Sequence, residues 1–282
     1  FIIFPYYCVI GGWVTKYALL SIQGGIHNAA SDTFFTGFIS KSAEPMICVL
    51  VFLIATTVVV AGGVKGGVER VSTIMMPVLI VLLIGVSLFC ITRPGAMAGV
   101  VYYLKPNLKG FSPTTILAAL GQLFYSMSLA MGIMITFGSY MPKKADLEKS
   151  VTQVEIFDTG VAFLAGLMIV PAVFVFSNGD SSMLAKGPSL MFVMLPKVFD
   201  SMAFSGVIAA LTSSISLLET LVAVLMDKFH MKRGTACITM FIIALLLAVP
   251  SSLGFGAWSN ITILGFDFLD FFDFISNSVL MP

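Results

Sequence analysis

Charged side chains are scarce in this sequence. Only 10% of its 282 residues are Asp, Glu, Lys or Arg, whereas 58% are hydrophobic. Globular domains that fold in water carry about 25% charged residues, so this composition excludes a soluble domain. The net charge of +1 gives nucleic acid no electrostatic attraction. We therefore predict a polytopic membrane protein with no nucleic-acid partner.

Cysteine and histidine, the residues that form disulfides and zinc sites, are also few. The four cysteines (Cys8, Cys48, Cys90 and Cys237) lie in apolar stretches without paired spacing, and the two histidines form no His-Glu-x-x-His motif. These spacings argue against a disulfide framework and against a zinc site. Nothing in these residue types predicts an enzyme.

Long uncharged runs divide the chain into predicted membrane-spanning segments. One bilayer crossing needs about 20 predominantly apolar residues. Seven runs fit this length, and an eighth begins at Phe268; the seven are 1–20, 46–64, 71–92, 114–141, 151–176, 204–226 and 235–250. We expect a single transmembrane domain over 1–282 that is a piece of a longer protein.

Three short links between these segments are rich in lysine and arginine. They carry Lys65 and Arg70, then Lys143, Lys144 and Lys149, and finally Lys228, Lys232 and Arg233. If the chain alternates sides, all three links face the same side, and the positive-inside rule makes that side cytoplasmic. The first segment then runs outward and the fourth runs inward.

The fourth segment is the one around which the others are organised. No charged residue occurs from Gly110 to Pro142, and Ser126, Ser128 and Gly132 loosen the centre of this run. A broken helix at this depth survives only where protein or a water-filled cavity covers it, and its freed carbonyls can bind ions. Alternatively, the small residues only let two helices pack closely. The residues alone leave both interpretations open.

Polar side chains inside other segments are further candidates. Asp158 lies about two turns into the fifth segment, where a lipid-facing acid costs about 3 kcal/mol, so it is a candidate for an ion or proton pathway. Thr212, Ser213 and Ser216 offer hydroxyl oxygens to a sodium ion or, alternatively, a polar stripe that joins helices. The Tyr7 hydroxyl needs a partner, either a substrate carboxylate or a carbonyl of the next helix.

Three acids stand near segment ends. Glu219, one turn beyond Ser216, is expected to pair with a neighbouring helix near the cytoplasmic side. Asp270 and Asp273 open the eighth segment near its outer end, where solvated interfacial acids are common. Depth alone therefore singles out Asp158 among the acids.

Four motifs, in order and spacing over essentially the whole chain, resemble the neurotransmitter:sodium symporters. The run from Gly121 to Tyr140 is similar to their sixth helix, and Leu211–Glu219 is similar to their eighth. Tyr6–Trp13 is similar to their third helix, and Leu269–Asp273 to the start of their tenth. The resemblance implies an all-α, broken-helix, inverted-repeat fold whose first two and last helices lie outside this chain.

The resemblance also implies a function and its residues. It implies sodium-coupled symport of an amino acid or related amine across the plasma membrane by alternating access. The substrate-binding residues would be Ile3, Tyr7, Tyr125, Ser126, Ser128, Met131 and Leu217. The sodium ligands would be Ser126 and Asp158 in one site, and the Ala209 carbonyl, Thr212 and Ser213 in a second. The outer gate would use Tyr7, Tyr125 and Asp273.

Two departures from the family pattern refine these expectations. Asp158 stands where the family often has Asn, so its extra negative charge is expected to remove any need for chloride. Met131 stands where some relatives carry Phe, and a flexible thioether predicts a pocket for a larger hydrophobic amino acid. Because the first helix would supply other ligands of both sodium sites, this chain alone is not expected to transport.

Other membrane proteins remain as alternatives. A proton-coupled or exchange transporter of the same architecture would use Asp158 as its proton carrier. A seven-helix receptor or retinal protein fits the number of segments, but no Lys lies in mid-segment for a Schiff base. An intramembrane aspartyl protease needs two facing acids at depth, and an inactive fragment is the last alternative. The sequence leaves the oligomeric state open.

Overall fold

Helices joined by short links form the chain in the computed structural model, which describes residues 2–23, 25–31, 33–105, 111–177, 179, 192–193, 196–197 and 209–280. The helices of the first half are α1 (Ile3–Ile22), α2 (Ile26–Ala29), α3 (Phe34–Ile39), α4 (Ala43–Ala61), η1 (Val64–Glu69), α5 (Arg70–Ile91) and α6 (Ala96–Leu104). Those of the second half are α7 (Pro113–Ser126), η3 (Leu129–Met131), α8 (Ile133–Tyr140), α9 (Leu147–Phe176), α11 (Ala209–Phe229), α12 (Arg233–Leu253), α13 (Phe268–Phe274) and η5 (Ile275–Leu280).

Four of these helical stretches are long and apolar enough to cross a membrane. They are Ala43–Ala61, Val64–Ile91, Leu147–Phe176 and Arg233–Leu253. Each overlaps one predicted segment, although the second begins at Val64, before the predicted start at 71, and their crossing of the membrane stays a prediction. The total of seven segments stays a prediction, and the start of the predicted sixth segment, 204–208, lies outside the described residues.

One predicted link is helical instead. The stretch expected to join the second and third segments forms the π-helix η1, which runs directly into α5. Gly63, the residue before η1, has a φ of +86°, a conformation that glycine adopts without steric cost. Gly67 then brings the backbone against α4, because a Cβ there would collide with the Val59 carbonyl oxygen. Glycine at these two positions therefore allows a short π-helix where a loop was expected.

The main hydrophobic core lies among α1, α4, α11 and α12. It contains Val9, Phe52, Leu218 and Met240, all nearly inaccessible to solvent. α1 and α4 approach closely, since a Cβ on Gly12 would lie only 2.8 Å from the Val49 backbone nitrogen. Small residues at such crossings let helix backbones approach within a membrane.

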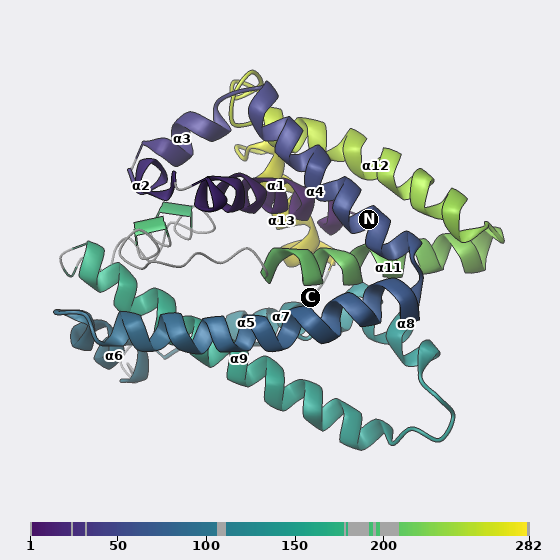
Figure 1. Cartoon of the computed structure of the whole chain (residues 1–282), viewed down its shortest axis with the longest axis horizontal. Coiled ribbons are helices and arrows are strands. Elements are labelled where there is room, and N and C mark those ends of the chain that lie inside the picture. Colours follow the sequence, from purple (N-terminus) through teal and green to yellow (C-terminus); the bar gives the residue numbers. More distant parts are fainter. Residues whose placement is uncertain are drawn as a thin grey trace.

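A second, separate core joins α5 to α9. Leu83, Val86 and Met168 are among its buried members. The Ser87 hydroxyl donates a hydrogen bond of 2.9 Å to the Leu164 carbonyl oxygen, which ties the two helices together. In Figure 1, α5, α6 and α9 occupy the lower part of the molecule, whereas α4 and α12 lie in the upper part.

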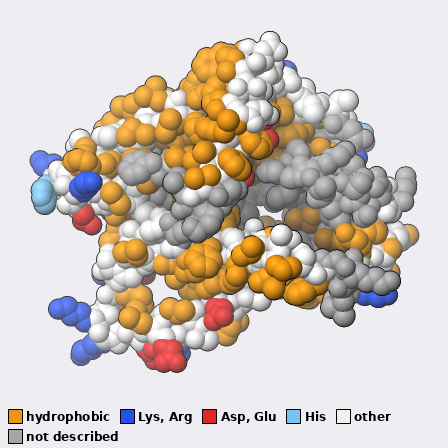
Figure 2. Space-filling view, turned by 180° about the vertical axis from the view of Figure 1, so that it is seen from behind, with side chains coloured by type: hydrophobic (Ala, Val, Ile, Leu, Met, Phe, Trp, Pro, Cys, Tyr) orange, Lys and Arg blue, Asp and Glu red, His pale blue; other side chains and the backbone are white. Residues whose placement is uncertain are grey.

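Apolar side chains also cover much of the surface. Figure 2 shows them in several broad patches on one face, with Lys and Arg side chains near its edges. Exposed examples are Val58 on α4, Val81 on α5 and Leu246 on α12, each 65–69% exposed. An exposed apolar surface of this kind is typical of a face that contacts lipid or further protein.

Candidate functional site

The fourth predicted segment is broken at its centre, which is the first of the two interpretations left open by its residues and the one that the family resemblance implies. Helix α7 ends at Ser126, and Ser128 takes a left-handed conformation with a φ of +56°. A single 3₁₀ turn, η3, follows, and α8 begins only after Gly132 at a φ of +74°. The main-chain direction therefore changes twice within a short stretch, which leaves peptide groups at the end of α7 and the start of α8 outside a continuous helix.

The acid predicted at depth lies directly beside this break. The Ser126 hydroxyl donates a hydrogen bond of 2.7 Å to Oδ1 of Asp158, in α9. Both residues are partly buried, whereas the neighbours of Asp158 along α9 are exposed. A carboxylate, a hydroxyl and freed carbonyls are the oxygen ligands that hard cations prefer. The structure thus brings together the two residues predicted for the first sodium site.

The predicted substrate residues come from separate elements that border the main core. Ile3 and Tyr7 of α1 and Met131 of η3 are partly buried against the main core, and Leu217 of α11 is buried within it. Ser128, at the strained turn, immediately precedes η3. Their assembly into one substrate site, and their contacts with substrate, stay a prediction.

The second predicted sodium site lies at the start of α11. Ala209 is the first residue of this helix, and Thr212 and Ser213 follow within its first turns. The side chains of 209–216 lie outside the part of the chain that the structure describes. Their role as sodium ligands therefore stays a prediction.

A cluster at the outer end includes one residue that the sequence did not single out. The Tyr6 hydroxyl is buried and makes no hydrogen bond of regular geometry within the described residues. Tyr125, Asp273 and Ser276 nevertheless lie close enough to the Tyr6 hydroxyl to interact with it electrostatically. Tyr125 and Asp273 are two of the three predicted gate residues, so α1, α7 and α13 converge where the outer gate was expected.

Glu219 forms a polar network near the predicted cytoplasmic side. It is fully buried and forms an ion pair with Arg233. The Tyr140 hydroxyl donates to Glu219 Oε1 at 3.0 Å, and Arg233 Nε donates to the Val60 carbonyl oxygen at 2.9 Å. The predicted pairing of Glu219 with a neighbouring helix is confirmed. Arg233 was assigned only to a basic link, and Tyr140 was not singled out for this contact.

Comparison with known proteins identifies the family of this architecture. A family model described as the sodium:neurotransmitter symporter family matches residues 33–280. The uncharacterized sodium-dependent transporter YhdH of Bacillus subtilis is 35% identical over 295 residues, covering 100% of this chain and 64% of that protein. An uncharacterized sodium-dependent transporter of Haemophilus influenzae is 36% identical, covering 99% of this chain and 64% of that protein.

A solved structure agrees with this fold. The crystal structure of MhsT in complex with L-phenylalanine superposes with a TM-score of 0.90 at 40% identity, and the match covers 100% of this chain and 66% of that chain. The chain thus spans just under two thirds of the length of these relatives. The match confirms the predicted broken-helix symporter fold, and it sets aside a receptor, a retinal protein and a protease.

Proposed function

Because the chain belongs to the sodium:neurotransmitter symporter family, whose members are transporters and not enzymes, we propose that the whole protein takes up an amino acid together with sodium. The hydrogen bond between Ser126 and Asp158 carries this proposal. It places a carboxylate and a hydroxyl at a break in a helix, where peptide carbonyls are also free to bind a cation. The plasma membrane, which is the inner membrane in a bacterium, is the proposed location.

Sodium in the first site would bind Asp158, Ser126 and carbonyl oxygens of the broken segment. The positive charge of a sodium ion there would compensate the negative charge of Asp158 inside the membrane. The Ala209 carbonyl, Thr212 and Ser213 would form a second site without a formal charge. The full negative charge in the first site would replace a chloride ion, so we propose transport that does not depend on chloride.

The substrate would lie between α1, η3 and α11. The Tyr7 hydroxyl would donate to its carboxylate, and Ile3, Met131 and Leu217 would contact its side chain. Met131 adapts to large apolar groups. The similar protein MhsT was crystallised with L-phenylalanine, which supports a hydrophobic amino acid as the substrate here.

Two separate hydrophobic cores support alternating access. α5 and α9 pack around one core, whereas α1, α4, α11 and α12 pack around the other. Interfaces between such bodies move more easily than the bodies deform. Tyr7, Tyr125 and Asp273 would close the outer entrance as the cytoplasmic side opens.

One observation favours a second candidate function. Asp158 accepts a hydrogen bond from Ser126, and an acid in this setting is also suited to carry a proton in a proton-coupled or exchange transporter. The two candidates differ in the cation on which substrate binding depends. Replacing sodium with choline at constant pH distinguishes them directly.

The test is equilibrium binding of labelled L-phenylalanine to the intact protein. We expect saturable binding in sodium chloride and in sodium gluconate, and none in choline chloride. Ser126→Ala should weaken sodium-dependent binding, whereas Ser139→Ala should not, because the Ser139 hydroxyl only donates to the Thr136 carbonyl within α8. Binding that persists in choline would overturn the sodium proposal and favour the proton-coupled candidate.

A further inference from the structure

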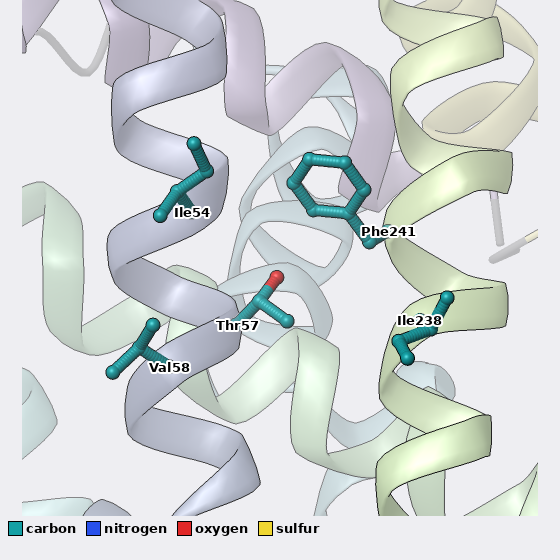
Figure 3. Close-up of a pocket in the computed structure, with 5 residues that line it drawn as sticks. All are labelled: Ile54, Thr57, Val58, Ile238 and Phe241. Atoms are coloured by element: carbon teal, nitrogen blue, oxygen red, sulfur yellow. The ribbon is translucent and has the colours of Figure 1, made fainter.

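A narrow apolar groove lies between α4 and α12 on the surface of the molecule. Ile54, Thr57 and Val58 line it from α4, and Ile238 and Phe241 line it from α12, around a cavity volume of about 210 Å³ (Figure 3). Figure 3 shows side chains of both helices bordering the space between the two ribbons. Ile54, Val58 and Ile238 are 47%, 65% and 62% exposed, so the groove is open along its length.

The groove offers no hydrogen bond to a water-soluble ligand. Its single hydroxyl, on Thr57, already donates to the Leu53 carbonyl oxygen at 2.7 Å. Every other lining side chain is hydrocarbon. A site of this kind gains binding energy only from apolar surface, which selects a hydrocarbon chain over any polar metabolite.

The position of the groove places it within one leaflet of the bilayer. Both flanking helices are candidate membrane spans. Val58 lies three residues before the end of α4, and Phe241 lies eight residues after the start of α12. At 1.5 Å per residue, the lining reaches about 12 Å from these helix ends. One leaflet of the hydrocarbon core is about 15 Å deep, so the groove faces the predicted cytoplasmic leaflet.

Positive charge gathers at this end of the two helices. Lys232 is the N-cap of α12, and the bond from Arg233 Nε to the Val60 carbonyl oxygen places it beside the end of α4. The exposed cations of the adjoining links are Lys65, Arg70, Lys228 and Lys232, against the exposed acids Glu69 and Asp227. Within the described residues, no carboxylate lies within 4.0 Å of Lys65 or Lys232.

We propose that this groove binds an anionic phospholipid of the cytoplasmic leaflet. One acyl chain lies along Ile54, Val58, Ile238 and Phe241, and the phosphate lies near Lys232. The charge of the head group complements the lysines, which attract anionic lipid over zwitterionic lipid. Another helix of the protein would fill this groove less well than an acyl chain does. A helix with its side chains is about 10 Å across, so it would contact only the exposed side chains at the rim and leave the groove itself unfilled.

The test measures contact between lipid and groove by quenching of tryptophan fluorescence. Phe241→Trp places the probe in the groove, and Ile238→Trp is a second probe should the first variant fold poorly. The intact protein is titrated in detergent with phosphatidylglycerol or phosphatidylcholine brominated on the acyl chain. The signal of native Trp13 and Trp258, recorded on the unchanged protein, is subtracted. Phe163→Trp on α9, where Phe163 is 46% exposed, reports general lipid contact.

We expect phosphatidylglycerol to reach half-maximal quenching in the groove at about fivefold lower mole fraction than phosphatidylcholine. The Phe163→Trp control should show no such preference. Lys232→Gln should abolish the preference, and Lys149→Gln, which removes an exposed cation at the start of α9, should keep it. Equal quenching by both lipids overturns the proposal. Absence of quenching in both groove variants also overturns it, because another protein segment or a second copy then covers the groove.

Discussion

Arg233, the first residue of α12, forms an ion pair with Glu219, an acid of α11 that is fully buried. The other Glu219 oxygen accepts the hydrogen bond from Tyr140, and the same guanidinium also reaches the end of α4. A carboxylate removed from solvent is strongly disfavoured unless partners compensate its charge. Helices α4, α8, α11 and α12 are therefore joined at their predicted cytoplasmic ends by contacts that compensate one buried acid.

Removing the arginine should destabilise this end of the molecule. Arg233→Met leaves Glu219 buried without a counter-charge, which typically costs about 3–5 kcal/mol. Glu219→Gln in the same background should recover most of the loss, because no buried charge then remains. Thermal denaturation in detergent measures both effects. Arg70→Met, which removes an exposed cation, is the matched control, and an equal loss in that variant would contradict the prediction.

The negative charge of Asp158 should determine sodium affinity. Asp158→Asn keeps the size of the side chain and an acceptor for Ser126 but removes the charge. Interactions with charged groups contribute about 1.5–3 kcal/mol, so the half-saturating sodium concentration should rise about tenfold or more. Binding of labelled L-phenylalanine at varied sodium gives this value. An unchanged sodium dependence would place the ion elsewhere.

Gly132 should be needed for the break between α7 and α8. A Cβ there has space, since the nearest side-chain atom, Thr220 Cγ2, would be 3.6 Å away. The φ of +74° is the obstacle, and Gly132→Ala should cost about 1–2 kcal/mol. Gly138→Ala in the adjoining α8 has open space and an ordinary helical backbone, so it should be neutral or stabilising. Thermal denaturation of the two variants distinguishes backbone strain from the added volume of a methyl group. Equal changes in denaturation temperature for Gly132→Ala and Gly138→Ala would refute the strain argument.

The approach of α1 to α4 should depend on a different property of glycine. A Cβ on Gly12 would meet the Val49 backbone, so Gly12→Ala must separate the helices at a cost of about 1–3 kcal/mol. A Cβ on Gly85, in α5, would have nothing within 4 Å. Gly85→Ala should therefore raise the denaturation temperature while Gly12→Ala lowers it. A loss in both variants would point to backbone effects in place of packing.

The parts of the site that depend on local chemistry were predictable from the sequence. Ser126, Ser128 and Gly132 lie within one uncharged run, and small or hydroxylated residues there weaken a helix, so a break was one of two open interpretations and the family resemblance favoured it. Asp158 stood out because an acid at membrane depth is costly. The resemblance to known symporters then paired Asp158 with Ser126, and the 2.7 Å hydrogen bond agrees with this pairing.

Contacts that depend on the direction of a side chain were not predictable in the same way. Arg233 belongs to a basic link, whose charges report the side of the membrane but not which cation turns inward to Glu219. Tyr6 and Tyr7 are successive residues of a helix and point about 100° apart. The pattern of the sequence does not say which of the two faces the substrate and which faces α13. Only the packing of α1 against α13, with Tyr125 of α7 beside Tyr6, decides between them.

Replacing each tyrosine by phenylalanine tests which of the two, Tyr6 or Tyr7, faces the substrate. The Tyr6 hydroxyl is buried without a hydrogen bond of regular geometry in the described part of the chain. Replacing such a group by hydrocarbon is close to neutral, so Tyr6→Phe should leave stability and binding nearly unchanged. Tyr7→Phe should weaken binding of L-phenylalanine about tenfold, because it removes a donor to the substrate carboxylate. Denaturation and equilibrium binding measured on both variants give the answer, because the reverse result would mean that Tyr6, and not Tyr7, faces the substrate.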